Sequence, residues 1–216
     1  MIEKLKEFIK NKETDKILNL IRETPEVLGQ QDESGTSGLL VIAYAGMPEV
    51  LEMAINLKPS FSFHEAVVCG LLELAKSLLD KNPELINQHA NDGFTPVSLA
   101  VFFDKSEMTK WLLDQGADPN LHATNPSKVN AMHAAVAKGN IELCQLLIAK
   151  GADVNAPQMQ NVTALHSAAH RGNLEMVTLL VENGAQINLK MENGDTALSI
   201  AKRDGHKEVT SYLEER

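Results

Sequence analysis

The residues of this chain best suited to chemistry are its seven histidines and two cysteines. Histidines at a suitable spacing could bind a metal, and a cysteine could act as a nucleophile with a base about 3 Å away. Cys69 is the candidate nucleophile and His170 the candidate base, because they fall at comparable places in similar stretches of sequence. The sequence has no phosphate-binding glycine loop and no His-Glu-x-x-His pair. Any chemistry therefore depends on the elements that position these residues.

Those elements repeat. Residues 163–173 read TALHSAAHRGN, and residues 196–206 read TALSIAKRDGH, 33 positions later. Aligning similar segments on the fourth letter gives a series spaced by 24, 34, 35, 33 and 33 residues: Leu40, His64, Ser98, His133, His166 and Ser199. Five of these segments have glycine six residues further on, and the sixth has Asp104 there. A second phrase reads GADPN at 116–120, GADVN at 151–155 and GAQIN at 184–188. Such a fixed period is typical of a stacked repeat protein.

Each unit predicts two short helices. The threonine of each TALH-like phrase can accept a hydrogen bond from a free N–H at a helix start, and the glycine can end that helix in a left-handed conformation. Asp104 must adopt that conformation with a Cβ, which aspartate tolerates better than most residues. In the second helix, Leu174, Val177 and Leu180 share one face. One pair is too small to bury its apolar face, so neighbouring pairs must stack.

These phrases resemble the ankyrin repeat family, in which Thr-Pro-Leu-His-x-Ala-Ala-x-x-Gly precedes Leu-Leu-x-x-Gly-Ala-Asp-x-Asn. The resemblance implies an all-α solenoid of stacked antiparallel helix pairs with short β-turn fingers. We count seven helix pairs, of which the first and last are caps. The spacing of 24 residues before His64 indicates a lost finger. We expect a single domain over 1–216, divided into a cap at 1–29, repeats at 30–58, 59–88, 89–121, 122–155 and 156–188, and a closing cap at 189–216.

The resemblance gives the histidines a structural role. In the family, the histidine at the repeated position bonds to the backbone of a loop, which implies the same for His64, His133 and His166. Cys69 and His170 lie three units apart, or roughly 24–30 Å at 8–10 Å per helix layer, too far for a catalytic dyad. Cys144 falls at an apolar helix position, as expected of a core residue. We therefore expect no catalytic residue, no metal and no cofactor.

Partners of the family bind a concave groove formed by the finger tips and by two positions just before the glycine of the first helix. Phe94 lies just past a finger tip. The pre-glycine positions carry over to Tyr44, Phe102, Phe103, Lys138, His170, Arg171, Lys202 and Arg203. The middle of this set is aromatic and its later half is basic. Adjacent aromatic residues on one short helix cannot both point into the same core, so Phe102 or Phe103 should reach the groove.

Composition narrows the class of partner. A net charge of −9 argues against binding nucleic acid or an anionic membrane, because such binding needs a basic surface. Two distant cysteines and the lack of a secretory signal or a long apolar run favour a cytoplasmic protein. We expect a monomeric, non-catalytic module whose groove binds a partner protein through an acidic segment. Two alternatives stay open: a regulator or inhibitor of a partner enzyme, and a small-molecule-binding or catalytic protein that uses the groove.

Overall fold

The computed structural model describes all 216 residues and contains fourteen α-helices, three short 3-10 helices and no β-strand. The expected all-α fold of seven helix pairs is confirmed. The chain forms two compact units, one of residues 1–85 with 90–92 and one of residues 86–89 with 93–216. The expectation of a single domain stays a prediction. Every helix is too short or too polar to span a membrane.

The first unit contains three helix pairs. Their bounds are α1 (Ile2–Lys10) and α2 (Thr14–Glu23), α3 (Gly38–Tyr44) and α4 (Pro48–Leu57), and α5 (Phe63–Cys69) and α6 (Leu72–Lys81). The 3-10 helix η1 (Pro25–Gly29) follows α2, and η2 (Pro83–Asn87) follows α6. Helix α3 packs against both α1 and α5, so the first helices of successive pairs are neighbours.

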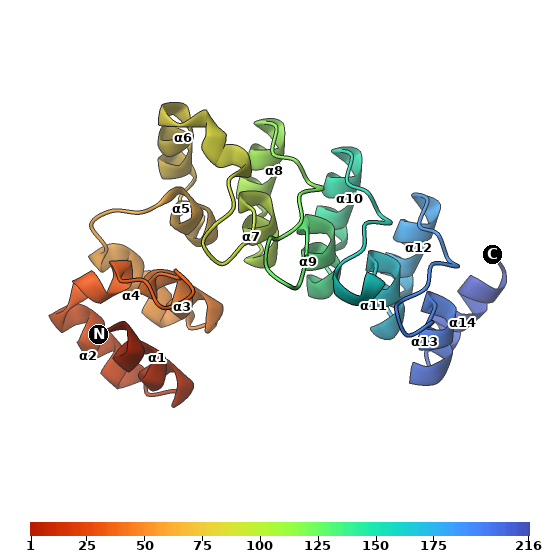
Figure 1. Cartoon of the computed structure of the whole chain (residues 1–216), viewed down its shortest axis with the longest axis horizontal. Coiled ribbons are helices and arrows are strands. Elements are labelled where there is room, and N and C mark those ends of the chain that lie inside the picture. Colours follow the sequence, from red (N-terminus) through yellow and green to blue (C-terminus); the bar gives the residue numbers. More distant parts are fainter. The chain divides into compact units, whose positions relative to one another are not determined.

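The second unit contains the other four pairs. Their bounds are α7 (Pro96–Phe102) and α8 (Ser106–Asp114), α9 (Ala131–Lys138) and α10 (Ile141–Ala149), α11 (Ala164–His170) and α12 (Leu174–Glu182), and α13 (Ala197–Asp204) and α14 (Lys207–Glu214). A third 3-10 helix, η3 (Met159–Asn161), precedes α11. Helices α7, α9, α11 and α13 pack in sequence to form one row, and α8, α10 and α12 lie in a second row (Figure 1).

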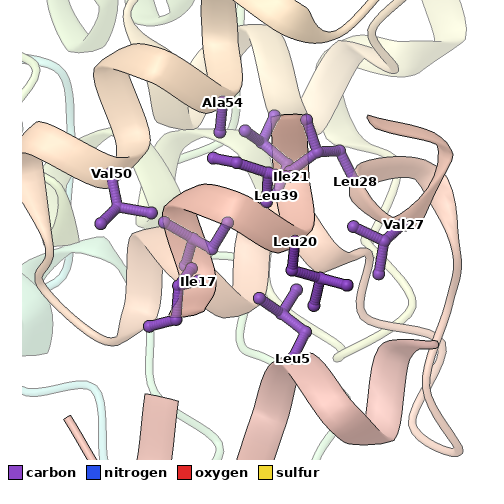
Figure 2. Packing of buried hydrophobic residues seen from close by; sticks show 10 residues of the cluster. Leu5, Ile17, Leu20, Ile21, Val27, Leu28, Leu39, Val50 and Ala54 are labelled. Carbon is purple, nitrogen blue, oxygen red and sulfur yellow. The ribbon is translucent and has the colours of Figure 1, made fainter. Parts of the chain in front are cut away.

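Aliphatic side chains hold the first unit together. Figure 2 shows these side chains from α1, α2, η1, α3 and α4 pointing toward one another. The buried cluster consists of Leu5, Ile17, Leu20, Ile21, Val27, Leu28, Leu39, Ile42, Val50 and Ala54. No aromatic ring is among these buried residues, as the low aromatic content predicts. A fully buried aliphatic side chain of this kind contributes about 1.5–3 kcal/mol relative to exposure.

The predicted helix signals are confirmed. The side chains of Thr95 and Thr196 each accept a hydrogen bond from the main-chain N–H three residues later, at 3.2 Å. Thr163 stands at the corresponding position before α11. One or two residues after the first helix of each pair lies a left-handed residue, with φ of 65° at Gly172 and 54° at Asp104. Asp104 therefore adopts the conformation that glycine adopts elsewhere.

The lost finger is also confirmed, because only the short linker 58–62 joins α4 to α5. A buried polar network lies at this linker. The Lys58 ammonium lies 3.3 Å from the Glu65 carboxylate, and their side chains are only 7% and 6% exposed. Lys58 also donates to the Leu28 carbonyl at 3.2 Å. Ser37 donates its hydroxyl to Glu65 at 2.6 Å, and Ser62 donates its main-chain N–H to the same carboxylate at 2.8 Å.

This network corrects the predicted alignment at His64. The residue that completes the capping box of α5 is Glu65, whose carboxylate accepts from Ser62 N while Ser62 Oγ accepts from Glu65 N. Counting back six residues from Gly70 selected His64, but α5 has one residue fewer between its cap and its glycine than α9 does. His64 therefore does not hold the structural position that His133 and His166 hold.

Candidate functional site

The two buried histidines of the second unit are structural. His133 Nδ1 accepts from Asn130 N at 3.3 Å, and His166 Nδ1 accepts from Thr163 N at 3.1 Å. Their Nε2 atoms lie 3.0 Å from the carbonyls of Ala156 and Leu189, to which a neutral ring with Nε2–H donates. Burial lowers the pKa of His133 to about 4 and also lowers the pKa of His166. Both nitrogens of each ring are therefore bonded within the protein.

The cysteines belong to different parts of the chain. Cys144 is fully buried, and burial raises the pKa of its thiol to about 12, as expected for an unreactive core residue. Cys69 is half-buried in the first unit, whereas His170 belongs to the second. The absence of a Cys69–His170 dyad stays a prediction.

An aromatic pair lies at the end of α7. Phe102 is 41% exposed, and Phe103 is half-buried. Their rings meet edge to face, with centroids 5.1 Å apart. The ammonium of Lys138, from the next first helix, lies 4.5 Å from the centroid of the Phe102 ring. Phe94, on the loop before α7, is half-buried. An exposed ring beside a cation forms a compact apolar and positive surface, which we call the Phe102 patch (Phe102, Phe103 and Lys138).

Tyr44 is the one predicted groove residue in the first unit. It is exposed at the end of α3, and its hydroxyl donates to Asp92 at 2.7 Å. Partial burial, followed by the carboxylate of Asp92, raises the pKa of Tyr44. The neighbouring Asn91 donates its side-chain amide to the Gly35 carbonyl at 3.1 Å. The structure thus joins the end of α3 to residues 90–92, but a groove shared with the second unit stays a prediction.

Most of the predicted basic residues are paired with acids. His170 Nδ1 lies 2.6 Å from the Asp204 carboxylate, and Lys202 Nζ lies 2.7 Å from the Glu214 carboxylate on α14. Arg203 contacts Asp195 at 2.5 Å and Asp204 at 3.3 Å. The hydrogen bond from Arg203 lowers the pKa of Asp195, and those from His170 and then Arg203 lower the pKa of Asp204.

This pairing leaves only two of the predicted basic residues without an acidic partner. Arg171 is exposed and forms no ion pair, and Lys138 stacks on Phe102 without a carboxylate partner. Sequence reasoning missed Asp204 and Glu214 as partners of the basic residues. The only signal was that Asp195 and Asp204 lie near Arg203 in the repeat. The positive charge that a ligand could still neutralise is therefore concentrated at Lys138 and Arg171.

A cavity of about 250 Å³ lies where α11, α13 and two finger segments meet. Val162, Met191 and Ile200 provide apolar walls, and His170 and Arg203 provide polar ones. These polar groups are already bonded to Asp204 and Asp195, and His166, which also lines the cavity, is bonded to backbone. The imidazoles and the guanidinium that line this cavity are therefore already engaged within the protein.

Comparison with known proteins gives the same picture of the repeats. A family model described as ankyrin repeats, in three copies, matches residues 63–158 and again 132–216. An ankyrin repeat protein of fowlpox virus is 34% identical over 99 residues, which cover 45% of this chain and 22% of the viral protein. A 26S proteasome regulatory subunit of Saccharomyces cerevisiae is 27% identical over 139 residues, covering 64% of this chain and 51% of the subunit.

A longer alignment comes from a transient receptor potential channel homologue of Caenorhabditis elegans. It is 28% identical over 167 residues, covering 68% of this chain but only 14% of the channel. The chain thus spans about half the length of the yeast subunit and less than a quarter of the other two relatives.

Proposed function

Because the chain belongs to the ankyrin repeat family, we propose that it is a non-catalytic module that binds a partner protein through its first-helix faces and finger tips. The observation that carries this proposal is the Phe102 patch, since exposed aromatic rings beside a cation are common anchors of protein interfaces. The repeats are held by their own packing before any partner arrives, so little ordering entropy opposes binding.

The partner that suits this surface is a protein segment with at least one carboxylate. Arg171 and Lys138 supply the unpaired positive charge, and Phe102 supplies an apolar contact beside it. The net charge of −9 makes an acidic nucleic acid a poor ligand, because the remaining surface repels phosphates. We propose that Arg203, His170 and Lys202 contribute less than sequence reasoning expects, since their charges are already paired.

A regulatory role is the second candidate. The yeast relative is a regulatory subunit of a larger assembly, and this chain covers about half of it. We propose by analogy that the module regulates or recruits a partner, and that it works as a cytoplasmic monomer with both cysteines free. Light scattering of the purified chain tests the monomer, and a dimer mass at micromolar concentration would contradict it.

Removing the two rings of the Phe102 patch tests the function. Phe102→Ala with Phe103→Ala should weaken binding of a partner purified from the native host by more than about tenfold, or 1.4 kcal/mol. Isothermal titration calorimetry measures the change. Phe8→Ala is the matched control, because Phe8 is another ring that lies beneath lysine ammonium groups, at 5.4 and 5.5 Å from its centroid. Unchanged affinity in the folded double variant would exclude the patch.

A further inference from the structure

The cavity between α11, α13 and their two finger segments has two polar atoms that the protein leaves open. Ser167 and His170 lie three residues apart on one face of α11, and both line the cavity. The Ser167 hydroxyl makes no hydrogen bond within the fold. His170 bonds to Asp204 through Nδ1 at 2.6 Å, so the neutral ring carries its proton there and Nε2 is left as an acceptor.

The other polar groups around the cavity bond to one another. Arg203 bonds to Asp195 and Asp204. Asn193 accepts from the Asp195 N–H and donates to its carboxylate, each at 3.0 Å. Both nitrogens of the His166 ring are bonded as well. A charged side chain that entered the cavity would lose its hydration without gaining a free partner of opposite charge, so the cavity favours a neutral occupant.

The walls and the volume of the cavity fit one aromatic ring. Val162, Met191 and Ile200 provide apolar walls from two finger segments and from α13. The volume of about 250 Å³ exceeds the roughly 150 Å³ of an engineered cavity that holds benzene. Tyrosine is the neutral aromatic residue whose hydroxyl can both donate and accept a hydrogen bond, whereas tryptophan can only donate.

We propose that this cavity is a pocket for a tyrosine side chain of the partner protein. The tyrosine hydroxyl donates to His170 Nε2 and accepts from the Ser167 hydroxyl, while its ring lies against the apolar walls. A phenylalanine in the same place would cover these two polar atoms without bonding to them. Because an unbonded buried polar atom is costly, the pocket selects tyrosine over phenylalanine.

Arg171 provides a free positive charge next to the pocket. It follows His170 in the chain, is exposed and forms no ion pair. A carboxylate beside the tyrosine of the partner would therefore pair with Arg171. This inference rests on the proposed function, because it names a second residue in the carboxylate-bearing segment that the module binds.

Short peptides of defined sequence test the pocket. The probe is acetyl-Ala-Asp-Tyr-Ala amide, titrated into the ¹⁵N-labelled protein, and matched peptides have phenylalanine or phosphotyrosine in place of tyrosine. The tyrosine peptide should shift the main-chain amides of Ser167 and Asn193 with a Kd on the order of 1 mM. The phenylalanine peptide should bind at least about fivefold more weakly, because two polar atoms lose their partner. The phosphotyrosine peptide should also bind at least about fivefold more weakly, because its charge meets no free cation in the cavity.

Two serine variants show whether the preference comes from the pocket. Ser167→Ala removes one of the two open polar atoms and should reduce the preference for tyrosine over phenylalanine by at least about threefold. Ser211→Ala, at an exposed serine of α14 outside the cavity, should keep the wild-type preference. Equal binding of the tyrosine and phenylalanine peptides to the wild type would overturn the proposal. Tighter binding of the phosphotyrosine peptide would also overturn it, because the occupant would then be an anion.

The double variant of the Phe102 patch separates this site from the one proposed above. Phe102→Ala with Phe103→Ala should leave the affinity for the tyrosine peptide unchanged. Loss of peptide binding in this variant would place the peptide at the Phe102 patch and overturn the tyrosine pocket. Since the Phe102 patch is tested with the native partner and the pocket with the peptides, either proposal can fail alone.

Discussion

Mild acid should destabilise the second unit through His133. This ring is 4% exposed, and its neutral form donates to the Ala156 carbonyl, so protonation would place an uncompensated charge in the interior. Its pKa is about 4 in the fold, well below the ordinary value near 6.5 of an unfolded chain. The unfolded chain therefore binds the extra proton between these values, and the stability that His133 contributes is complete above about pH 6.5 and lost as pH falls toward 4.

The size of the effect follows from that difference in pKa. Each pKa unit corresponds to about 1.36 kcal/mol, so the full loss is about 3 kcal/mol for this one ring. Between pH 7 and pH 5 the expected loss is about 2 kcal/mol, because His133 stays mostly neutral in the fold while the unfolded chain is protonated. His166 adds to the loss in the same direction, since burial also lowers its pKa.

Urea unfolding followed by circular dichroism at pH 7 and pH 5 measures the loss. His133→Gln keeps an amide that can hydrogen-bond but cannot take up a proton, so its stability should fall by about 2 kcal/mol less than the wild type over this range. If His133→Gln loses as much stability in acid as the wild type, the ring is not the titrating group and the reasoning is wrong.

Two further predictions concern packing, and both are measured by urea unfolding at pH 7. Lys58→Met leaves the Glu65 carboxylate buried without its ammonium partner and should lower the free energy of unfolding by about 3 kcal/mol. Adding Glu65→Gln to this variant should recover part of the loss. A double variant no more stable than Lys58→Met would contradict this prediction. Gly172→Ala should lower the free energy of unfolding by at least about 1 kcal/mol more than Gly139→Ala does. Both glycines are left-handed, but only a Cβ at position 172 would meet the His206 ring. Equal losses in the two variants would show that the His206 ring moves away freely.

The repeat made much of the fold predictable from sequence. Local signals with one dominant physical cause held: Thr95 caps its helix, Asp104 takes the left-handed conformation, and His133 bonds to a loop carbonyl. Each of these features depends on the backbone of one repeat or on the turn of the next repeat. The repeat period therefore determines where each feature occurs. The lost finger was visible for the same reason, since an interval of 24 residues leaves no room for one.

The features that the sequence did not reveal depend on side-chain conformations and on one helix length, which the repeat period does not fix. Arg203 forms ion pairs with Asp195 and Asp204. The repeat spacing does not predict the conformation of such a long side chain. Glu65 takes the capping position of α5 because that helix is one residue shorter than a periodic alignment assumes. The aromatic pair was partly predictable: one ring had to be exposed, but only the structure identifies it as Phe102.

The buried ammonium of Lys58 gives the first unit a built-in reporter. Acetylating enzymes and amine-reactive dyes need an accessible, unprotonated amine, and Lys58 is held against a carboxylate and a carbonyl with only 7% of its side chain exposed. The next residues of the linker, Pro59 and Ser60, are exposed. The Lys58 amine should nevertheless be modified only in molecules in which the first unit is locally unfolded. The rate at which Lys58 is labelled thus reports how often the first unit unfolds locally.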